Sequence, residues 1–215
     1  MQSNIAGIRK DYSQKALLEG EIKPGPIQQF AQWWQEAVDS DIDEVNAMTL
    51  ATASADGLPS ARIVLLKEFS EKGFVFFTNY ESFKGKQLAE NPKACLVFFW
   101  KELERQVRIT GFVQKISERE NDEYFYSRPV ASQIGASVSP QSQVIESRDW
   151  LIDQYKEIEK NKKEVAKLKR PAHWGGYCVR PVMVEFWQGR PGRLHDRLEY
   201  SLKDSGDWKI ERLAP

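Results

Sequence analysis

The fold is decided by AMTLATASADGLPSARIVLLKEF, residues 47–69. Two apolar runs, 47–54 and 60–69, are separated by an Asp-Gly pair, which is a strong signal for a tight turn between two strands. A third run, GFVFFTN at 73–79, follows after another short polar turn. Strands joined by such short turns are antiparallel, because a parallel connection needs a long crossover. The stretch therefore predicts the beginning of an antiparallel sheet.

Strands also dominate the rest of the chain, and they do not alternate regularly with helices. A doubly wound parallel sheet needs that alternation, so it is not expected. The predicted fold class is mainly β with peripheral helices, built as a mostly antiparallel barrel with helices packed outside it. Further strands are predicted at 93–100, 105–117, 175–189, 193–202 and 207–215, and helices at 26–40, 82–92, 117–129 and over most of 141–169.

The length and composition fit one domain with an N-terminal arm. Residues 1–25 are polar and end in KPGP, which predicts a flexible arm, and residues 26–215 are predicted to form a single domain. The 31 basic and 31 acidic side chains cancel, so no overall field recruits nucleic acid. No segment resembles a signal peptide or reaches membrane-spanning length, so a cytoplasmic protein is expected. Cys95 and Cys178 lie in apolar contexts and are expected to be buried thiols.

Several familiar chemical motifs are missing from the sequence. There is no GxGxxG and no GxxxxGK[ST], so a nucleotide cofactor would not be held by a Rossmann or P-loop device. There is also no GxSxG, and nothing else suggests a serine or cysteine nucleophile. Without CxxC, HExxH or a His/Cys cluster, no metal site is expected.

One of only two histidines lies in GRPGRLHDRLEY, residues 189–200. If this stretch is a strand, Arg193, His195 and Arg197 point to one face, because side chains alternate along a strand. One interpretation is an edge strand that its charges keep soluble. The other interpretation is a site for an anionic or electron-rich ligand.

Two stretches place cations where anions can bind. In ARIVLLKEF, Arg62 and Lys67 are five residues apart, so a regular strand directs them to opposite faces and to two different anions, unless a bulge changes the register. In TNYESFKGKQ, Thr78 ends a strand and Lys84 lies near a helix start, which is a natural position for a phosphate. Solvated strand-end charges and an ordinary capped helix are the alternatives.

Polar side chains gather in two further stretches. Gln106, in ERQVRITG, can hydrogen-bond the edge of a heterocycle. In EYFYSRPVASQIG, Tyr124 and Arg128 are one helical turn apart, with Ser132 a little beyond. These three groups suit a phosphate monoester, although a helix end with incidental polar groups has the same pattern. The basic stretch 160–170 indicates a solvated helix face, with nucleic-acid or partner-protein binding as the alternative.

Taken together, these motifs resemble one family, the pyridoxine (pyridoxamine) 5′-phosphate oxidases. The resemblance runs from about residue 5 to the C-terminus, and its most specific part is SRPVASQIGA together with EFWQG and RLHDR. The other matching segments are RIVLLK, FFTN, LERQVRITG, SPQS, GG and DWKIERLAP.

The resemblance implies a split β-barrel that binds FMN at a homodimer interface. It implies oxidation of pyridoxine 5′-phosphate or pyridoxamine 5′-phosphate to pyridoxal 5′-phosphate, with a hydride passing from substrate C4′ to flavin N5. Oxygen then reoxidises the flavin and yields hydrogen peroxide. In such an enzyme the cofactor carries the redox chemistry and the protein supplies position and electrostatics. A flavin-binding relative with another substrate, such as a reductase or a flavin carrier, is the alternative.

The same resemblance implies which residues hold the cofactor. Arg62 and Lys84, with Gln141 and Ser142, would grip the phosphate and ribityl chain of FMN. The rest of the flavin site would comprise Ile63, Val64, Leu65, Leu66, Lys67, Phe77, Thr78, Gln106, Trp187 and Arg197.

It also implies which residues bind the substrate. Arg193 and His195 would be the catalytic pair over the substrate ring, next to Leu194. A clamp on the substrate phosphate would comprise Lys67, Tyr124, Arg128 and Ser132, and a segment that closes over the substrate would comprise Arg9, Lys10, Asp11 and Tyr12.

The sequence departs from the family pattern at three positions. Phe83 stands where the family often has arginine, so one cation for the FMN phosphate is missing. Phe77 replaces a common tyrosine, and Ser137 replaces a frequent tryptophan. None of these changes touches the predicted substrate clamp or the predicted catalytic pair.

Overall fold

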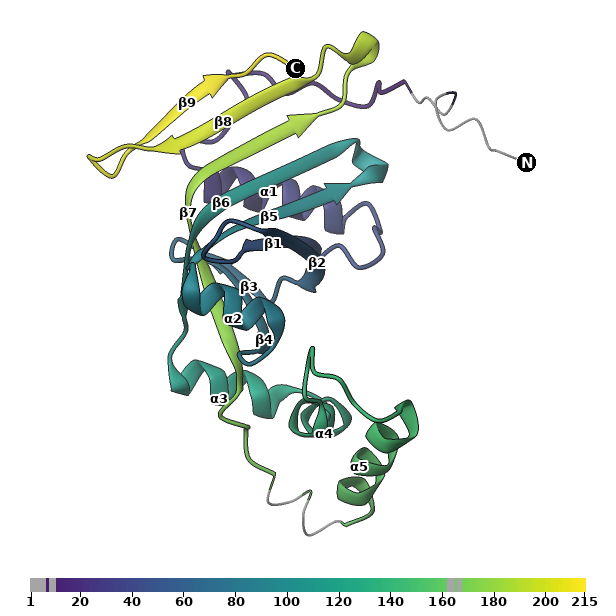
Figure 1. The fold of residues 1–215 in the computed structure, drawn as a ribbon. Coiled ribbons are helices and arrows are strands. Elements are labelled where there is room, and N and C mark those ends of the chain that lie inside the picture. The colour runs from purple at the N-terminus through teal and green to yellow at the C-terminus, as the bar shows by residue number, and fades with distance from the viewer. Residues whose placement is uncertain (1–6, 8–10, 162–164, 166–167) are drawn as a thin grey trace. The chain divides into compact units, whose positions relative to one another are not determined.

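An antiparallel sheet is the main feature of this computed structural model, which describes residues 7, 11–161, 165 and 168–215 (Figure 1). Its strands are β1 (Ala47–Ala53), β2 (Pro59–Leu65), β3 (Glu68–Ser70), β4 (Gly73–Asn79), β5 (Lys93–Trp100), β6 (Arg105–Lys115), β7 (Trp174–Gln188), β8 (Asp196–Leu202) and β9 (Trp208–Arg212). They are hydrogen-bonded in the order β2-β1-β5-β6-β7-β4-β3, with β8 on β7 and β9 on β8. The pairs β3–β4, β4–β7, β7–β8 and β8–β9 are antiparallel, and the β3–β4 pair agrees with the prediction from the short turns.

Helix starts follow the capping signals in the sequence. Pro26 occupies the first turn of its helix, where its missing N–H costs nothing. The hydroxyl of Ser82 accepts from the Gly85 N–H, and Ser117 forms a reciprocal capping box with Glu120. The helices are α1 (Pro26–Val38), α2 (Phe83–Glu90), α3 (Glu118–Ser127), α4 (Val130–Val138) and α5 (Arg148–Lys160), with single 3₁₀ turns η2 (Lys101–Leu103) and η3 (Pro191–Arg193).

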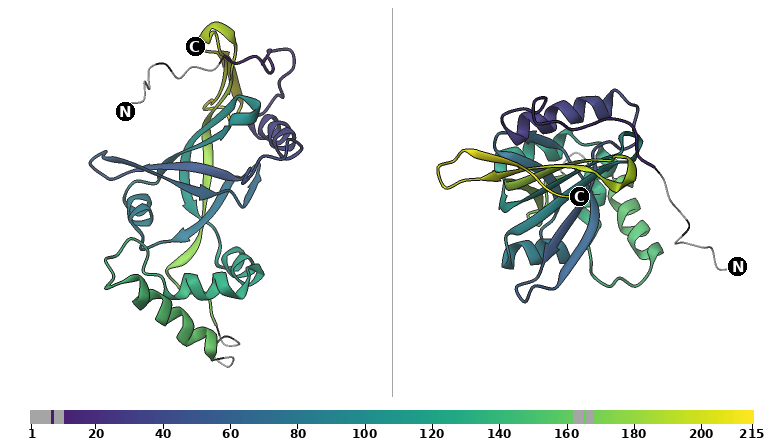
Figure 2. Two further views of the ribbon diagram at one scale, coloured as in Figure 1. Left: turned by 90° about the vertical axis from the view of Figure 1, so that its right-hand side faces the viewer. Right: turned by 90° about the horizontal axis from the view of Figure 1, so that it is seen from above.

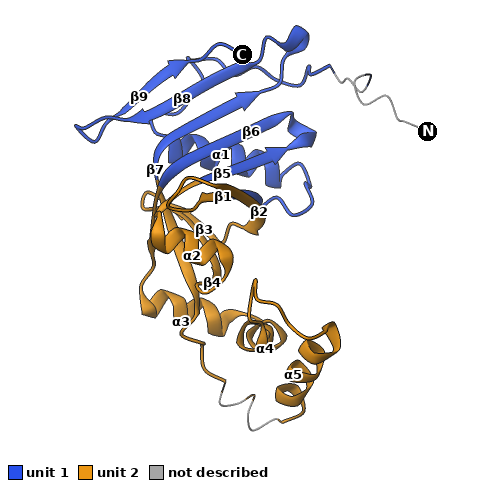
Figure 3. Cartoon of the chain, viewed as in Figure 1, with its two compact units in different colours: residues 1–50, 95–111, 181–215 blue, residues 51–94, 112–180 orange. Residues whose placement is uncertain are grey.

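The chain divides into two compact units, coloured separately in Figure 3. Strands β1, β5, β6 and β7 each contribute residues to both units. Within the described residues, no helix is both long enough and apolar enough to cross a membrane. Unit 1 comprises Met1–Leu50, Cys95–Gly111 and Pro181–Pro215, and unit 2 comprises Ala51–Ala94 and Phe112–Arg180.

The core of unit 1 is aromatic. Helix α1 lies along one face of the strands, as the views of Figures 1 and 2 show, and it buries Phe30 and Trp33 there. The Phe30 ring lies 5.2 Å from that of Phe98, and the Trp33 ring lies 5.2 Å from that of Phe186. Each ring removed from water contributes about 1.5–3 kcal/mol, so the amphipathic α1 is held mainly by this packing.

The core of unit 2 lies around β4 and β7. Phe74 and Phe76 of β4 are fully buried, and Phe125 of α3 is buried as well. Gly176 of β7 allows a close approach, because a Cβ there would lie 2.6 Å from Ile116 Cδ1. Helices α4 and α5 pack against each other in the same unit.

Three predicted elements are wrong in their bounds. The predicted strand 60–69 is two strands, because the chain turns away after Leu65 and the Lys67 N–H donates to the Val75 carbonyl. The predicted strand 193–202 begins only at 196, because Gly192 and Arg193 have left-handed φ angles of 65° and 63°, which an extended strand excludes.

The predicted helix over most of 141–169 is shorter than expected. Helix α5 begins after its cap Ser147, whose hydroxyl accepts from the Trp150 N–H. Residues 162–164 and 166–167 lie outside the described residues. The preceding α4 was not expected, although it starts directly after Pro129.

The two cysteines are free, as predicted. Cys178 is buried, and Cys95 is only half-buried.

Candidate active site

Unit 2 contains a cavity of about 320 Å³ among the cations that the sequence singled out. Four cationic side chains line it, and no carboxylate does so among the described residues. A cavity with this charge is suited to anions. The lining residues are Arg62, Ile63, Val64, Leu65, Lys67, Phe77, Thr78, Lys84, Tyr124, Arg128, Gln141 and Trp174.

Arg62 and Lys67 line this same cavity, so the prediction that they face opposite sides is wrong. That prediction assumed one regular strand through both residues. Strand β2 ends at Leu65, and the irregular link to β3 turns Lys67 toward the cavity. The alternation rule therefore does not hold over this short range.

Arg62 and Lys84 form one cationic edge of the cavity. The Arg62 guanidinium donates to Thr52 Oγ1 and to Ser60 Oγ, each over 2.6 Å. Lys84 Nζ donates to Thr78 Oγ1 over 3.1 Å and has Gln141 Oε1 at 3.5 Å. Burial, and then the charge of Arg62, lower the pKa of Lys84, and burial lowers the pKa of Arg62. A bound anion would relieve both effects, because it stabilises the charged forms.

Arg128 forms a second cationic edge, beside a stack of aromatic rings. The Phe77 ring stacks on Tyr124 at 3.9 Å and on Trp174 at 5.2 Å between centroids. The Arg128 guanidinium lies 4.7 Å from the Trp174 ring centroid, in cation–π geometry. Its Nη1 is buried and has no hydrogen-bond partner among the described residues. A buried guanidinium nitrogen without an acceptor is costly, so this group fits an incoming anion.

The sequence suggested that Arg128 and Tyr124 lie on the same helix, but they do not. Helix α3 ends at Ser127, and Arg128 is the extended C-cap residue because Pro129 follows. Both side chains nevertheless line the cavity.

Of the predicted cofactor and substrate residues that belong to unit 2, three are not among the lining residues. Ser132 is half-buried in α4, where its N–H donates to the Pro129 carbonyl. Leu66 is buried, so it acts as a core residue in this chain. Ser142 is exposed next to Gln141 and has a left-handed φ of 67°. Their predicted roles stay predictions.

Unit 1 holds the predicted catalytic pair outside any strand. His195 lies between η3 and β8, and its Nδ1 accepts a hydrogen bond of 3.1 Å from the Arg190 N–H. Its ring lies 4.7 Å from Trp187 and 5.8 Å from Tyr12 between centroids. Arg193 and Leu194 are exposed. The shared strand face predicted for Arg193, His195 and Arg197 does not exist, because only Arg197 lies in β8.

Arg197 is paired with a carboxylate that sequence reasoning missed. Glu185, a single acid in the apolar run VMVEFW, is buried and accepts from Arg197 Nε and from Arg108 Nη2 over 3.0 Å and 2.6 Å. Its hydrogen bond raises the pKa of Arg197. Gln106 is half-buried on β6 in the same unit, two residues from Arg108. The signal for Glu185 was available, because a carboxylate inside such a run is almost never buried unpaired.

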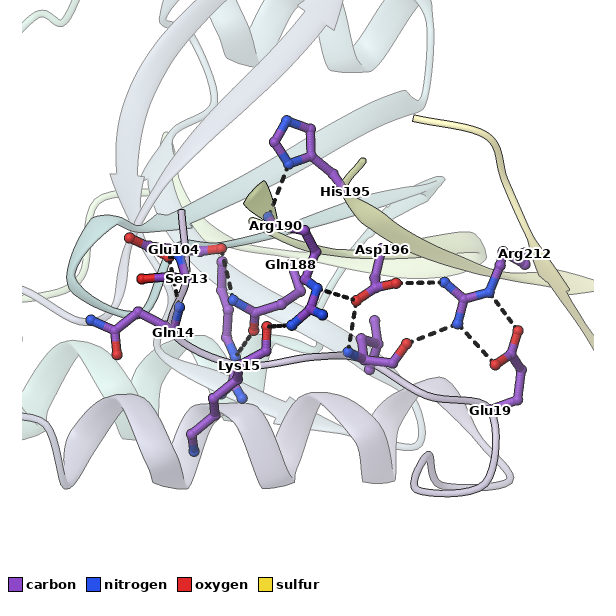
Figure 4. Close-up of polar contacts among 12 residues, drawn as sticks. Ser13, Gln14, Lys15, Glu19, Glu104, Gln188, Arg190, His195, Asp196 and Arg212 are labelled. Carbon is purple, nitrogen blue, oxygen red and sulfur yellow. Dashed lines mark hydrogen bonds and ion pairs between the residues drawn. The ribbon is translucent and has the colours of Figure 1, made fainter. Parts of the chain in front are cut away.

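The N-terminal segment is held by polar contacts in unit 1, shown in Figure 4. The Glu104 carboxylate accepts from the Ser13 and Gln14 N–H groups, and the Asp196 carboxylate accepts from the Leu17 N–H. Further along, Arg212 pairs with Asp196 and Glu19. Arg212 also donates to the Leu17 carbonyl, and Arg190 to the Lys15 carbonyl.

These contacts place Tyr12 against the rings of Trp187 and His195. Asp11 is exposed, and Arg9 and Lys10 lie outside the described residues. The closing of this segment over a substrate stays a prediction.

Two family models match the chain in succession. The model described as pyridoxamine 5′-phosphate oxidase matches residues 34–162, and the pyridoxine 5′-phosphate oxidase C-terminal dimerisation region matches residues 174–215. The pyridoxine/pyridoxamine 5′-phosphate oxidase of Trichormus variabilis is 55% identical over 215 residues, which cover 100% of both chains.

Solved structures with the same fold confirm the predicted fold class. PhzG from Burkholderia lata, solved with tetrahydrophenazine-1-carboxylic acid, has a TM-score of 0.85 and 31% identity, covering 93% of this chain and 98% of its own. A pyridoxamine 5′-phosphate oxidase-related, FMN-binding protein from Nostoc punctiforme has a TM-score of 0.71 over 89% and 98% of the two chains. Its 17% identity supports the fold alone.

Proposed function

This chain belongs to the pyridoxine/pyridoxamine 5′-phosphate oxidase family, and from that premise we propose that it oxidises pyridoxine 5′-phosphate or pyridoxamine 5′-phosphate to pyridoxal 5′-phosphate with FMN. When bound, FMN would supply the redox chemistry, by taking a hydride from substrate C4′ and passing the electrons to O2, which becomes hydrogen peroxide. The protein's own residues have to bind and orient the two phosphorylated molecules. The observation that carries the proposal is the cavity of unit 2, which four cations and no carboxylate line within the described part of the chain.

The residues of this cavity fit FMN and a phosphorylated substrate. Arg62 and Lys84 crowd two positive charges at one edge, where Gln141 adds an amide oxygen. We assign the FMN phosphate and ribityl chain to this edge, with Ser142 as a further contact. The other edge has the Arg128 Nη1, for which the described part of the chain offers no acceptor, and we assign the substrate phosphate to it.

The remaining groups of the substrate clamp are Lys67 and the Tyr124 hydroxyl, which line the same cavity, and Ser132, which does not. A cation and a hydroxyl donor suit phosphate oxygens that carry negative charge. Binding energy gained at the phosphate would fix the substrate ring without contacting the reacting carbon. Substitutions in this clamp should therefore raise KM more than they lower kcat.

His195 has a defined protonation pattern in its neutral form. Because the Arg190 N–H donates to Nδ1, the ring proton lies on Nε2. The ring therefore presents an Nε2–H donor. The Tyr12 ring meets it edge-on, and the Trp187 ring lies tilted against it. We assign to His195 and Arg193 the orientation of the substrate ring by hydrogen bonds, with Leu194 beside it. Trp187, Arg197 and Gln106 are assigned to the flavin ring.

We also propose that the working enzyme is a homodimer with FMN at the subunit interface. The match of residues 174–215 to a dimerisation region supports the homodimer. Mass measurement in solution, with and without FMN, tests the assembly and its dependence on the cofactor.

The decisive experiment is an anaerobic titration of the FMN-loaded protein with pyridoxamine 5′-phosphate, followed by flavin absorbance. We expect the absorbance to bleach, and we expect air to restore it while pyridoxal 5′-phosphate accumulates. An unchanged spectrum would contradict the oxidase and favour a flavin carrier or a reductase with another substrate.

The two histidines offer a matched pair of variants for the same titration. His195→Asn should slow the bleaching, because it removes the Nε2–H donor. His173→Asn should bleach at the wild-type rate, because His173 contacts the Ala136 carbonyl of unit 2 and does not line the cavity. Equal slowing in both variants would contradict the role assigned to His195.

A further inference from the structure

A buried amide lies behind the cationic edge of unit 2. Gln87 is on α2, and only 3% of its surface is exposed. Its Oε1 lies 2.6 Å from Thr52 Oγ1 and 2.7 Å from Ser60 Oγ. It therefore contacts the two hydroxyls that bind Arg62, and it does not itself line the cavity.

The direction of each hydrogen bond in this network follows from counting protons. A guanidinium has only donors, so both hydroxyls must accept from Arg62. Each hydroxyl has a single proton, and the amide oxygen of Gln87 accepts both protons through its two lone pairs. With their protons directed at Gln87, both hydroxyls keep a lone pair for Arg62 Nη1 and Nη2. The amide oxygen thus determines which way the hydroxyls point.

The network fixes the Arg62 guanidinium without cancelling its charge. Thr52 and Ser60 are neutral, and they hold the two terminal nitrogens at equal distances of 2.6 Å. A guanidinium held at two points has a defined plane, which bidentate recognition of a phosphate requires. A carboxylate in place of the hydroxyls would hold the side chain equally well, but it would repel the phosphate.

The amide of Gln87 also lowers the stability of the protein in a way that a purely structural residue would avoid. Its Nε2 is buried and has no hydrogen-bond partner among the described residues. An unpaired buried donor lowers stability, and an apolar side chain of similar length would avoid that loss. The amide is therefore better explained by what its oxygen does for Thr52 and Ser60.

We propose that Gln87 is a positioning residue for the FMN phosphate, which acts by fixing the plane of Arg62 through Thr52 and Ser60. The inference rests on the proposed function, because that function places the FMN phosphate at Arg62 and Lys84. It also explains how the site works with Phe83, which is 54% exposed, at a position where the resemblance of the sequence to the family implied an arginine. A preorganised guanidinium binds more tightly than a mobile one, so fewer cations suffice.

The test compares FMN with riboflavin, which has the same ring and ribityl chain but no phosphate. Apoprotein is titrated with each flavin by fluorescence, and the ratio of the riboflavin Kd to the FMN Kd measures phosphate recognition alone. In Gln87→Met we expect this ratio to fall about tenfold while the riboflavin Kd stays unchanged. Lys86→Ala, at an exposed neighbour on the same helix, should keep the wild-type ratio.

A second variant tests the relay, meaning the hydrogen bonds from Gln87 through Thr52 and Ser60 to Arg62, without changing the buried amide. Thr52→Val with Ser60→Ala removes both hydroxyls, and it should lower the ratio as Gln87→Met does. Adding Gln87→Met to this pair should cause no further fall, because the relay is already broken. Additive effects in the triple variant would overturn the proposal.

The outcomes separate this inference from the proposed function. A wild-type ratio near one would mean that the protein does not recognise the FMN phosphate, which overturns both. A wild-type preference for FMN that persists in Gln87→Met overturns only the role of Gln87. An equal loss of affinity for both flavins would show a structural role and would also overturn it. If Gln87→Met fails to fold, an unchanged ratio in the Thr52→Val, Ser60→Ala variant overturns the proposal by itself.

Discussion

The arginines of the two candidate sites are balanced in different ways. In unit 1, Arg197 and Arg108 share the buried carboxylate of Glu185. In unit 2, Arg62 is bound by two neutral hydroxyls. Arg128 lies over the Trp174 ring, and its Nη1 has no acceptor among the described residues. The Arg108–Glu185–Arg197 cluster of unit 1 thus contains its own anion, whereas the two hydroxyls at Arg62 and the ring beside Arg128 supply no negative charge. Substitution of Glu185 in unit 1 should therefore lower stability, and substitutions of the cavity cations should lower ligand affinity.

The largest expected effect is in unit 1. Glu185→Ala leaves two guanidiniums without their shared carboxylate, and we expect the free energy of unfolding to fall by about 3 kcal/mol. Urea denaturation of the ligand-free protein measures this change. Glu199→Ala is the matched control, because Glu199 is the cross-strand neighbour of Glu185 on β8 and acts on Arg197 only through its charge, without an ion pair among the described residues. Equal losses in the two variants would break the comparison.

A smaller effect, on binding, is expected in unit 2. Arg128→Ala removes the guanidinium assigned to the substrate phosphate, and KM for pyridoxamine 5′-phosphate should rise about 30-fold, which corresponds to about 2 kcal/mol. Stability without ligand should fall by only about 1 kcal/mol, the value of a cation–π contact. Steady-state kinetics and urea denaturation measure the two changes. Arg119→Ala, at an exposed arginine of α3, should change neither, and an unchanged KM in Arg128→Ala would refute the assignment.

The smallest effect is a pH dependence that has opposite signs for binding and folding. Burial and the charge of Arg62 lower the pKa of Lys84 in the folded protein below the ordinary value of 10.5. As pH rises through this lowered pKa, Lys84 loses its charge, so FMN affinity should fall a few-fold, about the value of one solvated charge contact. Over the window between the lowered and the ordinary pKa, the unfolded chain binds more protons, so this group makes the ligand-free protein more stable as pH rises.

Titration of apoprotein with FMN between neutral and alkaline pH measures the binding part. Lys84→Met should have a lower and pH-independent FMN affinity over the same range. A wild-type profile that stays flat would mean that Lys84 does not contact the phosphate.

Local patterns in the sequence predicted most of the fold. The strands 73–79 and 93–100 have the predicted bounds, because apolar runs between turn residues mark them clearly. The caps Ser82 and Ser117 were visible for the same local reason. Helix α4 was missed because its serines and glycine weaken the helical pattern, for which its packing against α5 and the buried Gln133 and Ile134 compensate.

The candidate site was predicted less evenly. The cations that the sequence singled out as phosphate ligands line one cavity, so residue type alone was enough to select them. The network behind Arg62 was not visible, because Thr52 and Gln87 are 35 residues apart and only the folded chain brings them together. The alternation rule also failed for Lys67 and His195, since both lie just outside a strand, where side-chain direction depends on the loop.

Most of the hydrogen bonds that hold the N-terminal segment are made by its main chain. Its partners in unit 1 contact the N–H groups of Ser13, Gln14 and Leu17 and the carbonyls of Lys15 and Leu17. Main-chain groups are the same for nearly all residue types, so these hydrogen bonds do not depend on the exposed side chains of Ser13 and Gln14, whereas Leu17 is buried and Lys15 pairs with Glu36. A deletion, an insertion or a proline between 13 and 17 would shift Tyr12 away from His195, whereas exchanging Ser13 and Gln14 for other non-proline residues would not. The length of the segment, more than the identity of its exposed side chains, thus sets the position of Tyr12.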